Sequence, residues 1–120
     1  MASSVALVAA GLILVLTLTP VAFPRSPDDA TARADAAARG VPLIYWRPGC
    51  SFCLRLRAAL GLRGRRAVWV NIHRDPAAAA RVREVNDGNE TVPTVFVGAE
   101  HRTNPAPSWV REQIKRAVVR

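Results

Sequence analysis

The chain has 120 residues, which suffices for one domain of ordinary size but not for two. Its 17 basic residues outnumber its 9 acidic ones, and the net charge of +8 raises the question of a nucleic-acid partner. The arginines are dispersed, however, with a cluster only at Arg63, Arg65 and Arg66, and no nucleic-acid-binding motif accompanies them. Because the arginines are dispersed and the motif is missing, we expect no nucleic-acid partner despite the positive charge.

The first element in chain order is an uncharged run over residues 5–23, VALVAAGLILVLTLTPVAF, whose only polar side chains are Thr17 and Thr19. Its length approaches the roughly 20 residues that cross a bilayer, so we expect residues 1–24 to form a single transmembrane anchor. A cleaved signal peptide is the alternative. It is weakened because no Lys or Arg precedes the run and no A-x-A cleavage site follows it.

The next segment, residues 25–40, has the sequence RSPDDATARADAAARG, with three Arg, three Asp and no large apolar side chain. Without a hydrophobic face to bury, it is predicted to be a flexible tether to a domain over residues 41–120. Arg25, Arg33 and Arg39 follow the apolar run, whereas no basic residue precedes it. The positive-inside tendency therefore places the domain on the cytoplasmic side of the cell membrane.

Strand and helix patterns alternate through the rest of the chain. Asp75-Pro76 is a typical helix start, with Asp as the N-cap and Pro at the first helical position. The expected elements are a strand over 41–46, a helix that Gly61 or Gly64 can end, a strand over 67–72, a helix from 76, a strand over 93–97, a short edge strand within 98–103, and a final helix that buries Val110, Ile114, Ala117 and Val118. Their order is β-α-β-α-β-β-α.

The only two cysteines, Cys50 and Cys53, lie together where the first strand gives way to the first helix. A disulfide across so short a gap closes almost no loop and would stabilise the fold little, so dithiol redox chemistry is favoured. Zinc is the other use of a Cys-x-x-Cys pair, but it usually takes four ligands, and His73 and His101 lack the spacing of a zinc finger. We therefore predict a redox site and no metal centre.

The two cysteines are expected to have different roles. Thiolate is the nucleophilic form of cysteine, and the free N–H groups and partial positive charge at a helix N-terminus favour it at Cys50. Arg47, three residues earlier, adds positive charge. Cys50 is thus predicted to be the nucleophile. Cys53, one turn into the helix, is predicted to be more buried and to resolve the mixed disulfide.

The element order with Cys-x-x-Cys at this junction resembles the thioredoxin fold, an α/β three-layer sandwich. Cys50-Ser51-Phe52-Cys53, Thr91-Val92-Pro93 and Phe96-Val97 narrow the resemblance to the glutaredoxin family. Within that family, the segments LRLRAAL and VNDGNETVPTV together with Thr103-Asn104-Pro105 are most similar to the mycoredoxins of actinobacteria, which act on mycothiol. The resemblance covers residues 41–120.

The resemblance implies a thiol-disulfide oxidoreductase that reduces mixed disulfides of a low-molecular-weight thiol. Mycothiol is expected as the co-substrate in preference to glutathione, with no permanently bound cofactor. It also implies that Pro93 follows a cis peptide bond and that the backbone of Val92 pairs with the thiol substrate. The expected substrate-binding residues are Arg47, Phe52, Thr91, Val92 and Pro93.

Two departures from the family pattern stand out. Thr103-Asn104-Pro105 occupies the region where many glutaredoxins carry Gly-Gly-x-x-Asp to hold glutathione, and Gly49 stands where mycoredoxins tend to have Trp. Ser51 replaces the proline of the motif, and relatives with a small residue there can hold a [2Fe-2S] cluster between two subunits. Cluster binding and disulfide exchange by an exported protein therefore remain the alternatives to a membrane-anchored, monomeric reductase.

Overall fold

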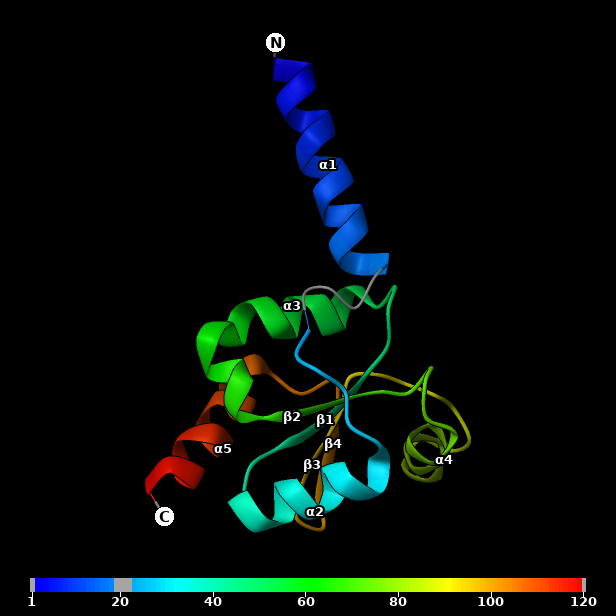
Figure 1. The fold of residues 1–120 in the computed structure, drawn as a ribbon, viewed down its shortest axis with the longest axis vertical. Coiled ribbons are helices and arrows are strands. Elements are labelled where there is room, and N and C mark those ends of the chain that lie inside the picture. Colours follow the sequence, from blue (N-terminus) through cyan, green and yellow to red (C-terminus); the bar gives the residue numbers. More distant parts are fainter. Residues whose placement is uncertain (1, 19–22, 120) are drawn as a thin grey trace.

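The computed structural model describes residues 2–18 and 23–119. Its elements, labelled in Figure 1 except for η2, are α1 (Ala2–Leu18), α2 (Asp29–Arg39), β1 (Leu43–Trp46), α3 (Ser51–Leu60), the 3-10 helix η2 (Gly61–Arg66), β2 (Val68–Asn71), α4 (Pro76–Val85), β3 (Thr94–Val97), β4 (Glu100–Thr103) and α5 (Pro107–Val119). From β1 onward the predicted order of strands and helices is confirmed. The added feature is η2, which continues directly from α3.

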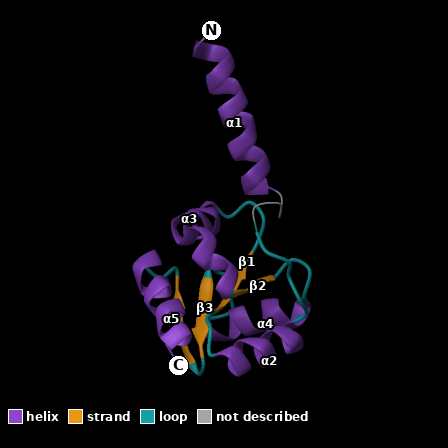
Figure 2. Ribbon diagram, turned by 60° about the vertical axis from the view of Figure 1, so that its left-hand side comes forward, coloured by secondary structure: helices purple, strands orange, loops and turns teal. Residues whose placement is uncertain are grey.

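The strands form one mixed sheet in the order β2-β1-β3-β4. β1 runs parallel to β2, with Leu43 opposite Val68, and antiparallel to β3, with Leu43 opposite Phe96. Figure 2 shows α3 and α5 on one face of the sheet and α2 and α4 on the other. A three-layer α/β sandwich results, as expected.

The central strand β1 is buried on both faces. Tyr45 and Trp46 are neighbours on this strand and point to opposite faces of the sheet, and both are fully buried. The reason is the layer arrangement, because alternate side chains of an interior strand point into helix layers on either side.

The helix-start signal at Asp75-Pro76 is confirmed. The Asp75 carboxylate accepts hydrogen bonds from the N–H groups of Ala77 at 3.0 Å and Ala78 at 3.3 Å, and Pro76 opens α4. In α5, Val110 and Ile114 are fully buried, whereas the side chain of Val118 lies outside the described part of the structure.

The segment predicted to be a tether instead contains a packed helix, so the prediction of flexibility is wrong for Asp29–Arg39. Ala32 and Ala36 lie one turn apart on the face of α2 that joins the core. Alanine is the strongest helix former and buries its methyl group at no cost in side-chain entropy. Small side chains thus provide a buried face that a search for large apolar residues overlooks.

Hydrogen bonds between polar side chains fix α2 to the sheet and to α4. The buried carboxylate of Asp29 accepts a hydrogen bond from the Tyr45 hydroxyl and pairs with Arg33 at 2.9 Å. The Asp29 N–H donates to Asp75 at 2.6 Å, and Arg81 donates to the Tyr45 hydroxyl oxygen at 2.9 Å. We call Asp29, Tyr45 and Arg81 the polar clamp. Burial, reinforced by the hydrogen bond to Asp29, raises the pKa of Tyr45 to about 12.

The apolar helix α1 projects away from the sandwich (Figure 1). The side chains described along it are mostly exposed. The anchor predicted over residues 1–24 includes residues 19–22, which lie outside the described residues. Within 2–18 and 23–119, no helix is both long enough and apolar enough to cross a membrane.

Candidate active site

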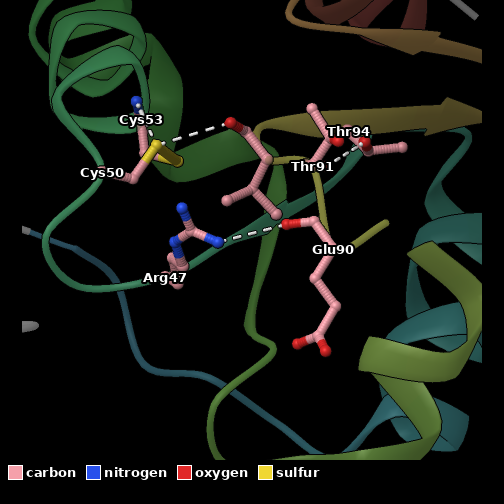
Figure 3. Close-up of a disulfide and its surroundings, with 7 residues drawn as sticks. Arg47, Cys50, Cys53, Glu90, Thr91 and Thr94 are labelled. Atoms are coloured by element: carbon pink, nitrogen blue, oxygen red, sulfur yellow. Dashed lines mark hydrogen bonds between the residues drawn. A yellow bond between two sulfur atoms is a disulfide. The ribbon is translucent and has the colours of Figure 1, made fainter. Parts of the chain in front are cut away.

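The two cysteines lie at the start of α3, joined by a disulfide with their Cα atoms 5.2 Å apart (Figure 3). Cys50 is the N-cap residue, with extended backbone angles, and its sulfur accepts the Cys53 N–H at 3.1 Å. The preceding Gly49 has a φ of 83°, a conformation that glycine adopts readily and side-chain-bearing residues rarely do. Glycine at position 49, where mycoredoxins tend to have Trp, therefore suits the turn that presents Cys50.

The two sulfurs differ in their access to solvent. Cys50 keeps 9% of its surface exposed and Cys53 none, while the intervening Phe52 is 50% exposed. In the reduced state, the hydrogen bond from the Cys53 N–H and the positive end of the α3 dipole would both stabilise a thiolate on Cys50. The arrangement suits attack by Cys50 on an external disulfide, with Cys53 within reach behind it.

The loop before β3 lies against the cysteines. The Val92 carbonyl oxygen is 3.5 Å from the Cys50 sulfur, and the Val92–Pro93 peptide bond is cis, as the resemblance implied. The loop is fixed at both ends, because the Asn104 N–H donates to the Pro93 carbonyl at 2.7 Å and the Thr94 hydroxyl donates to the Thr91 carbonyl at 2.7 Å. A substrate at Cys50 would therefore meet a fixed stretch of backbone.

Arg47 connects the strand before the cysteines to this loop. Its guanidinium donates to the Glu90 carbonyl at 3.3 Å, and the Glu90 carboxylate pairs with Arg83 at 3.2 Å. Figure 3 shows Arg47 directed toward Glu90, with no drawn contact to the sulfurs. The sequence predicted Arg47 as a site residue but not Glu90. The only signal for Glu90 in the sequence is its position next to Thr91.

A groove of about 200 Å³ opens beside the motif. Phe52 and Arg55 of α3 line one side, and Asn104 and Pro105 lie on the other. The Arg55 guanidinium carbon is 5.7 Å from the Phe52 ring centroid. The structure thus places Thr103-Asn104-Pro105 beside the site, as the resemblance implied, whereas the part played by Arg55 was missed.

The described residues contain no group of three or more His, Cys, Asp or Glu side chains that could hold a metal ion. The Cys50–Cys53 disulfide shows that the two thiols are close enough for dithiol redox chemistry. A cysteine pair at a helix start, facing a fixed backbone loop on a mixed sheet, is the arrangement of thiol-disulfide oxidoreductases with a thioredoxin-like fold.

Comparison with known proteins narrows this class. The sequence pattern of the Glutaredoxin family matches residues 43–102. A glutaredoxin-like protein of Mycobacterium tuberculosis is 40% identical over 72 residues, which are 59% of this chain and 86% of the relative. Mycoredoxin 1 of Corynebacterium glutamicum is 36% identical over 73 residues, which are 60% of this chain and 90% of that protein.

The chain belongs to the glutaredoxin family. Membership implies thiol-disulfide oxidoreductase activity with a low-molecular-weight thiol as co-substrate. The predictions of family, fold and reaction class are therefore confirmed at this level.

Proposed function

We propose that the protein reduces mixed disulfides between mycothiol and the thiols of proteins or small molecules. The observation that carries the proposal is the position of Cys50, the more exposed cysteine, 3.5 Å from the carbonyl oxygen of Val92 and bonded to the N–H of Cys53. The similarity to Mycoredoxin 1 supports mycothiol as the co-substrate.

The reaction begins with attack of the Cys50 thiolate on the mycothiol sulfur of the mixed disulfide. The substrate S–S bond breaks, the substrate leaves as a thiolate that takes up a proton, and a disulfide forms between Cys50 and mycothiol. A second mycothiol then attacks the mycothiol sulfur of this adduct, which yields oxidised mycothiol and restores the Cys50 thiolate.

Cys53 provides a second route out of the adduct. Its thiolate attacks the Cys50 sulfur, releases mycothiol and leaves the Cys50–Cys53 disulfide, which two further thiols reduce. In both routes, the backbone at Val92 and Pro93 positions the thiol substrate, with Phe52 and Thr91 at the rim of the site. Arg47 supports this geometry through its hydrogen bond to the Glu90 carbonyl.

The test uses one peptide disulfide-bonded either to mycothiol or to glutathione, with the matching thiol as reductant. We expect kcat/KM to be at least about tenfold higher for the mycothiol pair, a difference of roughly 1.4 kcal/mol in transition-state binding. Equal or reversed values would contradict mycothiol as the co-substrate. Failure to reduce either peptide would contradict the reductase function itself. Cys50→Ser protein is the blank.

We also propose that residues 1–24 hold the protein at the cell membrane with the redox domain on the cytoplasmic side. The support is the uncharged run over residues 5–23 followed by Arg25, Arg33 and Arg39. After mild reduction, Cys50 in intact cells should react with a membrane-impermeant maleimide only when the cells are permeabilised. Prompt labelling of intact cells would instead favour disulfide exchange outside the cell.

A further inference from the structure

The 3-10 helix η2 presents one apolar and three basic side chains to solvent. Leu62 is 77% exposed, the highest value among the exposed large apolar side chains of the described residues. Arg63, Arg65 and Arg66 are exposed as well. No salt bridge within residues 2–18 and 23–119 involves these three arginines.

The inner side of η2 is tightly packed, which fixes the outward direction of these side chains. The Gly64 carbonyl accepts a hydrogen bond from the Trp69 indole N–H at 2.7 Å, and Arg57 donates to the Gly61 carbonyl at 2.7 Å. A Cβ atom at Gly64 would lie only 2.8 Å from the Arg57 guanidinium. The conformation of η2 is thus set by its packing against Arg57 and Trp69, with Leu62 on the exposed side.

Few acidic side chains lie near these arginines. The α2 residue Asp35 and the preceding Asp28 line a hollow together with Arg65, but Asp35 pairs with Arg39 at 2.9 Å. α3 and η2 carry no acidic residue, and β2 carries none. On α5, Arg111 donates to the Ala59 carbonyl at the end of α3 at 3.0 Å. The acidic residue of α5, Glu112, pairs with Arg116 at 3.7 Å. A basic corner with a leucine at its tip results.

We propose that η2 binds the surface of an anionic lipid bilayer, with the three arginines on lipid phosphates and Leu62 inserted at the boundary with the acyl chains. Basic side chains near an anionic leaflet and a buried apolar side chain are the two contributions that hold a segment at such an interface. The exposed Leu62 favours a lipid bilayer over a nucleic acid as the partner, because a nucleic-acid backbone offers phosphates but no apolar layer beneath them.

The position of η2 agrees with a bilayer as its partner. α1, whose described side chains from Val5 onward are apolar and mostly exposed, contacts α3, and η2 continues from the far end of that same helix (Figure 1). One bilayer could therefore cover both exposed apolar features. This inference is independent of the thiol that the redox site uses.

The test measures partition of the full-length protein into phosphatidylcholine vesicles with and without phosphatidylglycerol. We expect stronger partition into the anionic vesicles. The triple variant R63Q/R65Q/R66Q should lose about 100-fold of that preference, because each basic side chain near the surface contributes roughly fivefold. Leu62→Ser should weaken partition into anionic vesicles about tenfold through lost apolar burial.

The matched control is R74Q/R83Q/R102Q, which removes the same charge from α4, the turn before it, and β4. It should retain the preference for anionic vesicles. An equal loss in both triple variants, or no effect of Leu62→Ser, would overturn the proposal. So would tighter binding to duplex DNA than to vesicles, lost in R63Q/R65Q/R66Q. A far-ultraviolet circular dichroism spectrum that matches that of the wild type confirms that each variant is folded.

Discussion

The redox site and the polar clamp lie on opposite faces of the same sheet and are built in opposite ways. At the site, main-chain groups surround the Cys50 sulfur, chiefly the Cys53 N–H at 3.1 Å and the Val92 carbonyl at 3.5 Å. In the clamp, side chains satisfy one another, with the buried Asp29 bonded to the buried Tyr45 and Tyr45 bonded to the half-buried Arg81. Reactivity therefore depends on backbone placement and stability on side-chain pairing, so substitutions should separate the two properties.

The largest effect should come from Cys50→Ser. Loss of the nucleophile removes the covalent route, so turnover of mixed disulfides should fall by at least about 1,000-fold. Under reducing conditions the free energy of unfolding should change by less than about 1 kcal/mol, because the substitution is conservative in size. Steady-state kinetics and urea denaturation measure the two quantities. Residual turnover near that of the wild type would contradict the assignment of Cys50.

Asp29→Ala should produce the converse result. It leaves the buried Tyr45 hydroxyl without its acceptor and Arg33 without its partner, so we expect the free energy of unfolding to fall by about 2–3 kcal/mol. The kcat/KM for mixed disulfides should remain unchanged, because the clamp lies on the face of the sheet away from the cysteines.

The control for Asp29 lies on the same helix. Asp35 pairs with Arg39 at 2.9 Å on the exposed side of α2. Asp35→Ala should cost less than about 0.5 kcal/mol, as exposed ion pairs usually do. Equal losses of stability at the two positions would show that α2 is not fixed through the clamp.

The clamp should also give stability a dependence on high pH. Burial and then the bond to Asp29 raise the pKa of Tyr45 from 10.0 to about 12. A raised pKa in the folded state means that this stabilisation is fully present below pH 10.0 and is lost as the pH rises toward about 12. Because Tyr45 is the only tyrosine, ultraviolet absorbance of the oxidised protein reports its titration directly. Tyr45→Phe should flatten the pH dependence of stability in this window, and an ordinary pKa for Tyr45 would contradict the account.

The smallest effect on turnover should come from Cys53→Ser. Because Cys50 alone can complete the cycle with a second mycothiol, activity on small mixed disulfides should stay within about tenfold of the wild type. The variant cannot form the Cys50–Cys53 disulfide, so substrates that need this route should slow more. Stopped assays with a small and a protein mixed disulfide would distinguish the two. Complete loss on both would make Cys53 essential to every turnover.

Local signals explain why most of the fold was predictable. The Asp75-Pro76 helix start and the apolar strands carry their information in adjacent residues. The packing of α2 was missed because its buried face consists of Ala32 and Ala36. Its polar contacts join residues far apart in the chain, with Asp29 bonded to Tyr45. No periodicity within residues 25–40 reveals such a partner.

The active site likewise has parts that the sequence predicted and parts that it did not. Cys50, Cys53 and the loop ending in Pro93 were indicated by motifs, because the residue types themselves carry the chemistry. Glu90 and Arg55 were not indicated. Glu90 contributes a main-chain carbonyl, which any residue possesses, and Arg55 lines the groove only because α3 lies beside residues 104–107. Contacts that use backbone groups, or that join segments distant in the sequence, cannot be predicted from the types of the residues involved.

The central claim is that Cys50 is the thiol that attacks, and the site of the first covalent adduct tests it most directly. Cys53→Ser and Cys50→Ser proteins, each fully reduced, would be exposed to oxidised mycothiol, quenched with acid and mapped by peptide mass spectrometry. The account predicts rapid addition of one mycothiol to Cys50 in the Cys53→Ser protein and slow addition to the buried Cys53 in the Cys50→Ser protein. Addition to Cys53 at an equal or greater rate would contradict it.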